Sequence, residues 1–317
     1  MRSRLTVGAF SPSVLLRVAR RTGRLDAHAL VVDETPVTSS AAQFQALLAG
    51  DLDAALTSPD NVVAYRYTTD NPLGRTGDVR IVAAVDRGLG LALYGRPGLT
   101  TPAALRGATI GVDVATTGFA FALYAAAESI GLRRGDYRVV ALGSTPRRLV
   151  ALLAGGCDAT ILNAGNELRA ERAGCAALVR VVDVCAPYLG TVLAVAGDAH
   201  VEAATRLAAA LRETAVAITA GYLHEVTADE AASGLDLPPE LARRYVERLA
   251  DPAEGLVVDG LVDPAALRTV LDLRRRYLPG GTDGVDPLAP GSGLLTAAAV
   301  TGAGYEIQDA RPIEDVR

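Results

Sequence analysis

Lysine and tryptophan are both absent from this chain of 317 residues, so the basic side chains other than histidine are all arginine. Without lysine, the chain has no residue for a Schiff base or for a lysine nucleophile. Cysteine and histidine occur three times each. Residues 157, 175 and 185 form no CxxC pair, and the histidines show no HxH or HxxxH spacing. We therefore expect reduced thiols, no metal site and no cofactor.

Positive charge and long apolar runs are also scarce. The net charge is −5 and the sequence contains no basic run, which argues against a nucleic-acid partner. No stretch approaches the roughly 18 consecutive apolar residues of a membrane helix, so we expect no membrane insertion. Residues 5–10 indicate a core strand rather than a secretory signal. We expect a cytoplasmic protein, unless a leader was removed, and we leave a homodimer open.

One segment of the sequence occurs twice. Residues 46–54 read ALLAGDLDA and residues 151–159 read ALLAGGCDA, an offset of 151 − 46 = 105 residues. Each copy combines the apolar end of a helix, a glycine stop and an Asp-Ala pair that opens a short strand. A polar turn that starts a helix follows each strand, at residues 57–61 and 163–167. An offset this long exceeds a solenoid period and predicts two similar α/β lobes with a cleft between them.

The order of elements supports this duplication. Strands at 5–10, 29–32 and 54–57 alternate with helices, and strands at 109–112, 137–142 and 160–162 repeat the pattern. This order predicts parallel strands with right-handed crossovers. Two strands break at glycine-containing segments and then resume, at 86–90 and 187–190. We interpret these segments as two crossings between the lobes.

The remaining chain predicts three helices, at 201–223, 240–249 and 264–277, followed by a segment rich in Gly, Pro and Asp. We expect that last segment to have little structure of its own. The predicted fold class is α/β, with two similar doubly wound lobes joined by two hinge crossings, plus C-terminal helices. Lobe I comprises residues 1–88 and 191–280, lobe II residues 89–190, and the C-terminal tail residues 281–317.

Several of these segments resemble a known family. They are residues 46–54, residues 101–112 (TPAALRGATIGV), residues 142–146 with 151–159, and residues 260–271. In this order they are similar to the type 2 periplasmic-binding-protein fold, in the branch of sulfonate, taurine and nitrate solute-binding proteins and thiamine-pyrimidine synthases. The resemblance covers about residues 4–280. It implies that a small ligand binds in the cleft by hinge closure. Solute-binding members carry a leader, which we do not expect here, and the thiamine-pyrimidine synthases carry a cysteine-rich signature, which this sequence lacks.

The predicted cleft residues follow from the topology. Ligands of parallel sheets bind beyond the carboxyl ends of the strands, and helix N-termini at those positions favour an anion. Each such residue alone is also an ordinary helix cap, and it is the shared placement on both lobes that favours a ligand site. The ligand-binding candidates are Ser11, Ser58, Asn61, Arg87, Thr116, Thr117, Gly118, Phe119, Thr145, Asn163, Asn166 and Tyr188.

Some of these candidates have a second interpretation. Arg87 would clamp an acidic group or be a solvated surface arginine, and Phe119 would stack on a ring or pack in a core. Tyr188 would close over a ligand, donate a proton or pack at the hinge. Asp60 and Glu167 would act as general bases in a dry cleft, or favour the dipole of their helices. Asp60, Glu167 and Tyr188 are therefore weak catalytic candidates.

The sequence leaves three functions open. The first is binding of a small organic ligand, anionic or aromatic, in the cleft by hinge closure, as in the substrate-binding proteins of ABC transporters. The second is a cytoplasmic biosynthetic enzyme on the same fold, a decarboxylase, lyase or isomerase of an acidic molecule. The third is a cytoplasmic ligand sensor. The sequence contains no Ser-His-Asp arrangement, phosphate loop or dinucleotide fingerprint.

Overall fold

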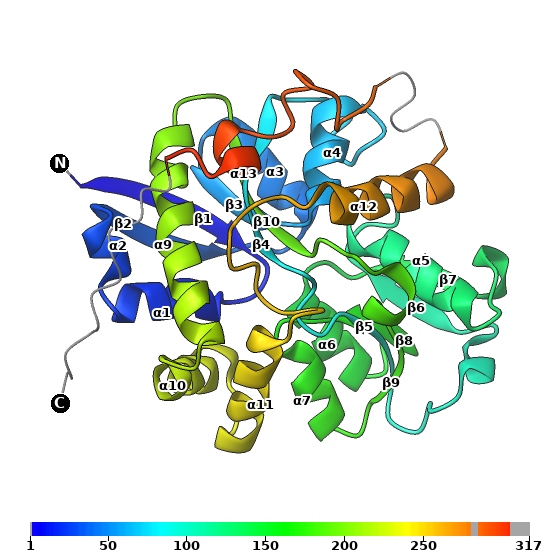
Figure 1. Ribbon diagram of the computed structural model, residues 1–317. Helices are drawn as coiled ribbons and strands as arrows, with labels where there is room; N and C mark the ends of the chain where they lie inside the picture. Colours follow the sequence, from blue (N-terminus) through cyan, green and yellow to red (C-terminus); the bar gives the residue numbers. More distant parts are fainter. Residues whose placement is uncertain (1, 280–284, 305–317) are drawn as a thin grey trace.

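The computed structural model describes residues 2–279 and 285–304, and it contains two five-stranded sheets (Figure 1). The first sheet has the order β2-β1-β3-β10-β4 and the second the order β7-β6-β8-β5-β9. The strands of the first sheet are β1 (Ser3–Ala9), β2 (Leu30–Pro36), β3 (Ala54–Thr57), β4 (Val79–Asp86) and β10 (Thr191–Ala196). Those of the second are β5 (Ala92–Gly95), β6 (Thr109–Val112), β7 (Arg138–Ala141), β8 (Ala159–Leu162) and β9 (Ala176–Arg180).

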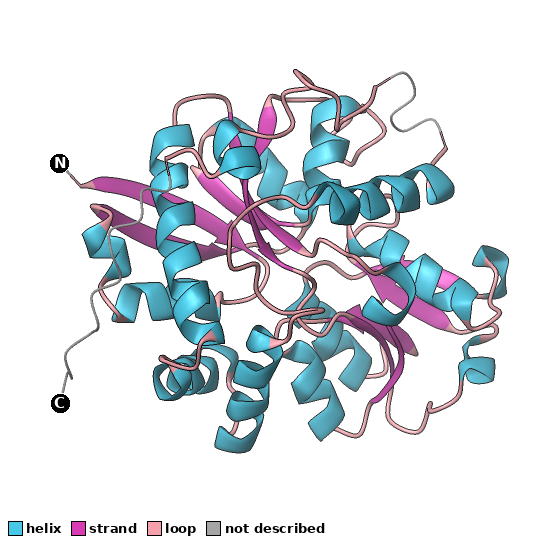
Figure 2. Cartoon of the chain, in the orientation of Figure 1, coloured by secondary structure: helices cyan, strands magenta, loops and turns pink. Residues whose placement is uncertain are grey.

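Helices surround both sheets, and Figure 2 shows each sheet with its own set. Those of the first part are α1 (Val14–Arg21), α2 (Arg24–Ala27), α3 (Ser40–Ala49), α4 (Pro59–Tyr67), α9 (Val201–Thr219), α10 (His224–Leu235), α11 (Pro239–Ala250), α12 (Pro264–Tyr277) and α13 (Ala297–Thr301). Those of the second are α5 (Phe119–Ser129), α6 (Thr145–Leu153), α7 (Asn166–Arg172), α8 (Val182–Cys185) and the 3₁₀ turns Pro102–Leu105 and Arg134–Asp136. Within residues 2–279 and 285–304, no helix is long and apolar enough to cross a membrane.

The two sheets confirm the predicted pair of α/β lobes. The chain passes from β4 to β5 and returns through α8 to β10, so it crosses between the sheets twice. The prediction of parallel strands holds for β1 with β2 and β3, and for β6 with β7 and β8. The strands β5 and β10 run antiparallel to their neighbours, because each directly follows a crossing and enters its sheet from the cleft side.

The repeated segment has the same role in both lobes. Its two copies form the ends of α3 and α6, and both then lead into the strands β3 and β8. The aspartate of each copy accepts a hydrogen bond from the strand that its own strand pairs with in parallel, β1 in one lobe and β6 in the other. Asp53 Oδ2 lies 2.7 Å from the amide nitrogen of Thr6, and Asp158 Oδ2 lies 2.8 Å from that of Thr109. The segment therefore fixes where the next turn leaves each sheet.

Four local features differ from the predictions. The N-cap of α1 is Ser13, whose Oγ accepts from the amide of Leu16, rather than Ser11. Residues 179–184 were predicted as one strand, but Val181 adopts helical angles and the chain turns there into α8. Helix α10 was not predicted. The segment after α12 was expected to have little structure of its own, yet residues 285–304 include α13 and a bridge from Leu295 to β4. The remainder of that segment lies outside the described residues.

Candidate ligand-binding cleft

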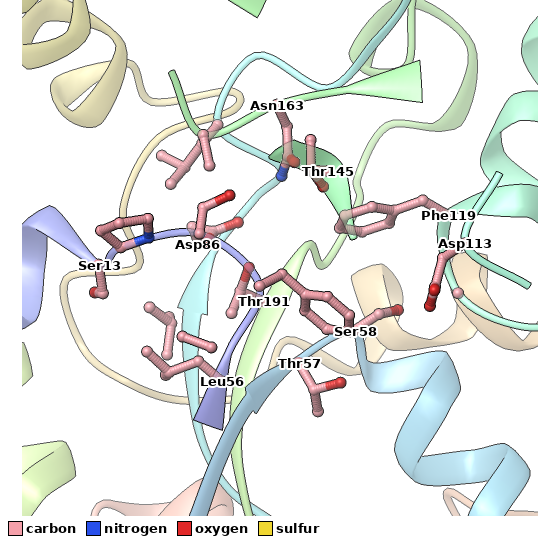
Figure 3. A pocket seen from close by; sticks show the side chains of 18 of the residues that line it. Ser13, Leu56, Thr57, Ser58, Asp86, Asp113, Phe119, Thr145, Asn163 and Thr191 are labelled. Atoms are coloured by element: carbon pink, nitrogen blue, oxygen red, sulfur yellow. The ribbon is translucent and has the colours of Figure 1, made fainter. Parts of the chain in front are cut away.

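A cavity lies between the two sheets, where the carboxyl ends of β1, β3, β4, β6 and β8 meet. It offers about 110 Å³ to the centres of water molecules, against the roughly 10–15 Å³ that one buried water needs. Figure 3 shows Phe119 and Asp113 on one side, Ser13 and Leu56 on the other, and Asp86 with Thr191 between them. The cavity is therefore large enough for a small molecule that contacts both lobes.

Three side-chain oxygen atoms of residues that line the cavity lack partners in the part of the chain that the structure describes. Within the described residues, Ser58 Oγ, Thr117 Oγ1 and Asn61 Oδ1 are buried and have no hydrogen-bond partner. Ser58 is the N-cap of α4, and Gly118, which follows Thr117, is the N-cap of α5. Buried polar groups are usually hydrogen-bonded, so unpartnered groups around a cavity indicate a bound molecule. The dipoles of α4 and α5 favour a negative charge at these N-termini.

An arginine also lines the cavity. Arg148 on α6 is buried, and its guanidinium donates to the carbonyl oxygens of Gly143 (2.6 Å) and Ile161 (3.2 Å) and to Thr145 Oγ1 (2.9 Å). Burial lowers its pKa to about 10, so it stays protonated at neutral pH. Since a guanidinium carries five N–H groups, these three acceptors leave capacity for another. Arg148 therefore supplies a fixed positive charge at the wall of the cavity.

Two carboxylates also face the cavity. Asp113 Oδ2 accepts from the amide of Ser40 at 2.9 Å, which connects lobe II to the start of α3 in lobe I. Its Oδ1 has no partner among the described residues. Asp86 ends β4 and is 2% exposed. Burial raises the pKa of Asp86 to about 6, although hydrogen bonds from Thr191 and the amide of Gly88 oppose the shift.

The other end of the cavity is apolar. It is lined by α1 and by residues from α11 and the loop that follows. The apolar side chains there are Val14, Leu15, Leu56, Val85, Leu89, Leu249 and Leu256. An apolar wall beside a few polar groups is the usual composition of a small-molecule site, in which the polar groups fix orientation.

The structure brings most of the predicted ligand residues together. Eight line this one cavity: Ser11, Ser58, Asn61, Thr117, Gly118, Phe119, Thr145 and Asn163. Four others do not line it: Arg87, Thr116, Asn166 and Tyr188. Asn166 lies directly behind the cavity wall, where its Nδ2 donates to Ser11 Oγ at 3.1 Å, from lobe II to lobe I.

Arg87 and Tyr188 lie on the far side of the crossings. Both line a separate groove that also includes Pro187, Val262 and Ala266. The guanidinium of Arg87 donates to the carbonyl oxygen of Leu256 at 2.7 Å. The reason is geometric. Asp86 ends β4 facing the cavity, so the next side chain on the chain points away from it.

The predicted catalytic acids are both buried away from the cavity lining. Asp60 receives Arg274 Nη1 at 3.1 Å and the amide of Gly118 at 2.6 Å, and burial raises its pKa. Glu167 is fully buried between α7 and α11, 4.0 Å from Arg248, a distance too long for a hydrogen bond. Burial therefore raises the pKa of Glu167 to about 8. Neither acid is positioned to act on a molecule in the cavity.

Several lining residues were not predicted. They are Ser13, Thr57, Asp86, Asp113, Arg148, Thr191, Tyr245, Leu249 and Leu256, with further apolar residues of α1. Asp86 and Asp113 immediately follow predicted strands, so the rule that selected Ser58 and Asn163 would also have found them. Tyr245 and Leu249 come from a helix far along the chain, and nothing in their local sequence relates them to the cleft.

The fold and the cavity define a two-lobed binding protein, in which each lobe contributes helix N-termini to a shared site. A family model described as "ABC transporter, phosphonate, periplasmic substrate-binding protein" matches residues 20–225. Because this match covers more than half of the chain, the protein belongs to that family of substrate-binding proteins. A search of curated proteins gives no match.

Solved structures share the fold at low sequence identity. The alkanesulfonate-binding protein of Xanthomonas axonopodis pv. citri, bound to MOPS, is 15% identical, with a TM-score of 0.69 over 89% of this chain and 96% of its own. The nitrate-binding protein of Synechocystis PCC 6803 is 12% identical, with a TM-score of 0.72 over 89% and 84%. A ligand-binding component of an ABC-type import system from Staphylococcus aureus is 12% identical, with a TM-score of 0.75 over 96% of this chain and 100% of its own. These likenesses support the predicted periplasmic-binding-protein fold.

Proposed function

We propose that the ligand of this substrate-binding protein is a small organic acid of the phosphonate or sulfonate type, delivered to the permease of an ABC importer. The observation that carries this proposal is that Ser58 and Thr117, with unpartnered hydroxyls, and the buried Arg148 all line one cavity. The family assignment supports it. The acid group would lie between the N-termini of α4, α5 and α6, with the rest of the ligand along the apolar wall.

The hydrogen-bonding capacity of this end fits an oxyanion. The hydroxyls of Ser58 and Thr117 are free to donate. Arg148 adds the positive charge, and its burial makes its interaction with an anion stronger than it would be in water. A phosphonate or sulfonate presents three oxygens, enough to accept from all three elements.

The arrangement of the lobes supports binding by closure. Hydrogen bonds connect the lobes around the cavity, among them those from the amide of Gly118 to Asp60, from the amide of Ser40 to Asp113, and from Asn166 to Ser11. Each is a direct contact between groups of the two lobes, so the lobes are closed on each other in this structure. A ligand that contacts both lobes would stabilise this state over an open one.

The lobe boundaries and the location of the protein are parts of the same proposal. We place lobe I at residues 1–88 and 191–280 and lobe II at 89–190, which agrees with the two crossings at 87–91 and 186–190. The family description is periplasmic, so the cytoplasmic location stays a prediction. Fractionation of cells that express the native gene, with detection of the protein in each fraction, tests it.

The ligand class is tested by thermal-shift screening of purified protein. The panel contains phosphonates, sulfonates and carboxylates of matched carbon skeleton, together with alkyl alcohols of the same size. At least one acid should raise the melting temperature by several degrees, because a ligand at 100 times its dissociation constant stabilises by about 2.7 kcal/mol. The alcohols should have no effect. If no acid shifts the melting temperature, the proposed ligand class is wrong.

A further inference from the structure

A buried acid lies where the two lobes touch each other, outside the ligand cavity. Glu167 belongs to α7 of lobe II, and its side chain is 0% exposed. It does not line the cavity. Both of its carboxyl oxygens are buried and have no hydrogen-bond partner within the described residues. An ionised carboxylate at this place lacks the water and the donors that would stabilise its charge.

The arginine that faces Glu167 is bound elsewhere. Arg248 belongs to α11 of lobe I, which lies beside α7 (Figure 1), and its Nε is 4.0 Å from Glu167 Oε1, too far for a hydrogen bond. Its Nη1 donates to Glu254 Oε1 at 2.8 Å, and Arg180 of lobe II pairs with the same oxygen at 3.2 Å. A Cβ on Gly90, at the first crossing, would lie 2.8 Å from this Nη1. The guanidinium is therefore held between Glu254 and the crossing.

The other charged and titratable groups around Glu167 do not hydrogen-bond to it either. They are Tyr94 on β5, Tyr245 and Arg244 on α11, Glu171 and Arg169 on α7, and Asp236 at the end of α10. The hydroxyl of Tyr94 donates to Glu171 at 2.8 Å, and Arg244 pairs with Glu171 at 2.8 Å. Burial consequently raises the pKa of Glu167 to about 8, although the charge of Arg248 opposes the shift.

Lobe I supplies part of the cover over Glu167. Helix α11 contributes Tyr245 and Arg248 to its surroundings. Helix α10 packs on the start of α7, where a Cβ on Gly165 would lie 2.7 Å from Leu235 Cδ1. Both helices pack on lobe I, against α1 and α9, so they move away from α7 when the lobes part. Water then reaches the carboxyl group, and its pKa falls towards the ordinary value of 4.5.

We propose that Glu167 is a proton-dependent switch between the lobes: the lobes close with a proton on its carboxyl group and open when that proton is lost to the solvent. A neutral carboxyl group costs far less to bury than a carboxylate. In the open state the group is ionised at neutral pH, so closing takes up a proton. The contribution of this proton to closing is complete below about pH 4.5 and is lost as pH rises through about 8. The inference rests on the hinge closure of the proposed function and is independent of the ligand class.

An ion pair between Glu167 and Arg248 is the competing explanation. In that case the ionised carboxylate would hold the lobes together, and a rise in pH would not open them. The two explanations therefore predict different effects of pH on the shape of the molecule. Glu167→Gln removes the titration and keeps the size of the side chain.

Small-angle X-ray scattering of the full chain without ligand, at pH 7 and pH 9.5, tests the switch. Both values lie above the pKa of about 6 of Asp86, the buried acid of the cavity, so that group stays mainly ionised. The matched control is Glu230→Gln, because Glu230 pairs with Arg17 at 2.8 Å inside lobe I. Circular dichroism checks that each protein remains folded at both pH values.

In the natural protein and in Glu230→Gln, the ratio of open to closed molecules should rise by about tenfold from pH 7 to pH 9.5, and the radius of gyration should rise with it. Glu167→Gln should have the same radius at both pH values. A radius of the natural protein that is unchanged or smaller at pH 9.5 would overturn the inference, and so would an equal rise in Glu167→Gln. Because no ligand is present, these outcomes are independent of the ligand class, which the thermal-shift panel tests.

Discussion

The hydroxyl of Thr117 and that of its neighbour Thr116 have different surroundings. Thr117 Oγ1 is buried beside the cavity and has no partner within the described residues, whereas Thr116 does not line the cavity. We expect Thr117→Ala to weaken binding of an acidic ligand by about tenfold, the effect of one hydrogen bond to a charged group. Thr117→Ser should retain most of the affinity, because it keeps the hydroxyl.

The matched control for this prediction is Thr116→Ala, which should change the affinity by less than about twofold. Calorimetric titration of the three variants with the same acid measures the effect, and circular dichroism checks that each is folded. Unchanged affinity in Thr117→Ala would show that the hydroxyl does not contact the ligand.

At the scale of single residues, the sequence predicted part of the cleft. Ser58, Thr117 and Asn163 were found because each follows a predicted strand and starts or precedes a helix. Arg87 was selected because it lies at a predicted crossing and could bind an acid group, but it does not line the cavity. Its neighbour Asp86 does, because adjacent side chains of an extended chain point to opposite sides. Residues such as Leu249 could not be found, since tertiary packing alone places α11 at the cavity.

Helices α7 and α11 enclose a buried acid between the lobes. Glu167 is fully buried on α7, and burial raises its pKa from the ordinary 4.5 to about 8. Its protonated form therefore favours the folded state fully below about pH 4.5, and this contribution is lost as pH rises through about 8. The glutamine of Glu167→Gln stays neutral at every pH. The free energy of unfolding of this variant should therefore rise relative to that of the natural protein between pH 5 and pH 9, by on the order of a few kcal/mol.

Urea denaturation of both proteins at pH 5, 7 and 9 measures this difference. The control is Glu171→Gln on the same helix, because Glu171 pairs with Arg244 at 2.8 Å and is part-exposed. The control should give no such rise. A constant difference between Glu167→Gln and the natural protein across the three pH values would contradict the assignment.

Helix α12 packs on α4 of its own lobe through a buried ion pair and also contacts α5 of lobe II. Arg274 is fully buried, donates to Asp60 on α4, and lies over the ring of Phe121 on α5, 5.7 Å from the ring centre. Asp60→Asn would leave the guanidinium without a carboxylate partner and should cost about 3–5 kcal/mol. The double variant Asp60→Asn with Arg274→Met removes both charges and should be more stable than Asp60→Asn alone.

Thermal denaturation of the natural protein and both variants tests this pair. If the double variant unfolds at or below the temperature of Asp60→Asn, the charge of Arg274 is not what Asp60 compensates. At this scale the sequence predicted α12 with its observed bounds. It did not predict the pair, because 214 residues separate its members.

The whole molecule shows the duplication that the sequence indicated. The Asp53 and Asp158 hydrogen bonds are equivalent in the two lobes, and both lead to polar turns at one cavity. Local patterns sufficed for this, since each lobe is built from short-range α/β units. The direction of β5 and β10 was not predictable from those patterns, because it depends on how the crossings enter each sheet.

Closure of the lobes gives a prediction for the shape of the molecule. The hydrogen bonds from Gly118 to Asp60 and from Ser40 to Asp113 hold the lobes together around the cavity. A bound ligand should favour this state, so the radius of gyration measured by small-angle X-ray scattering should fall when an acid that binds is added. An acid that does not bind serves as the control. An unchanged radius on saturation would argue against hinge closure.

The central claim is that one small acid binds in the cavity between the lobes. The most direct measurement is a calorimetric titration of the natural protein and of the Ser58→Ala/Thr117→Ala double variant with the phosphonate and sulfonate panel. We predict one site per chain with a dissociation constant of about 10 μM or below, and a loss of at least about tenfold in the double variant. Absence of binding across the panel, or equal affinity of the two proteins, would contradict the claim.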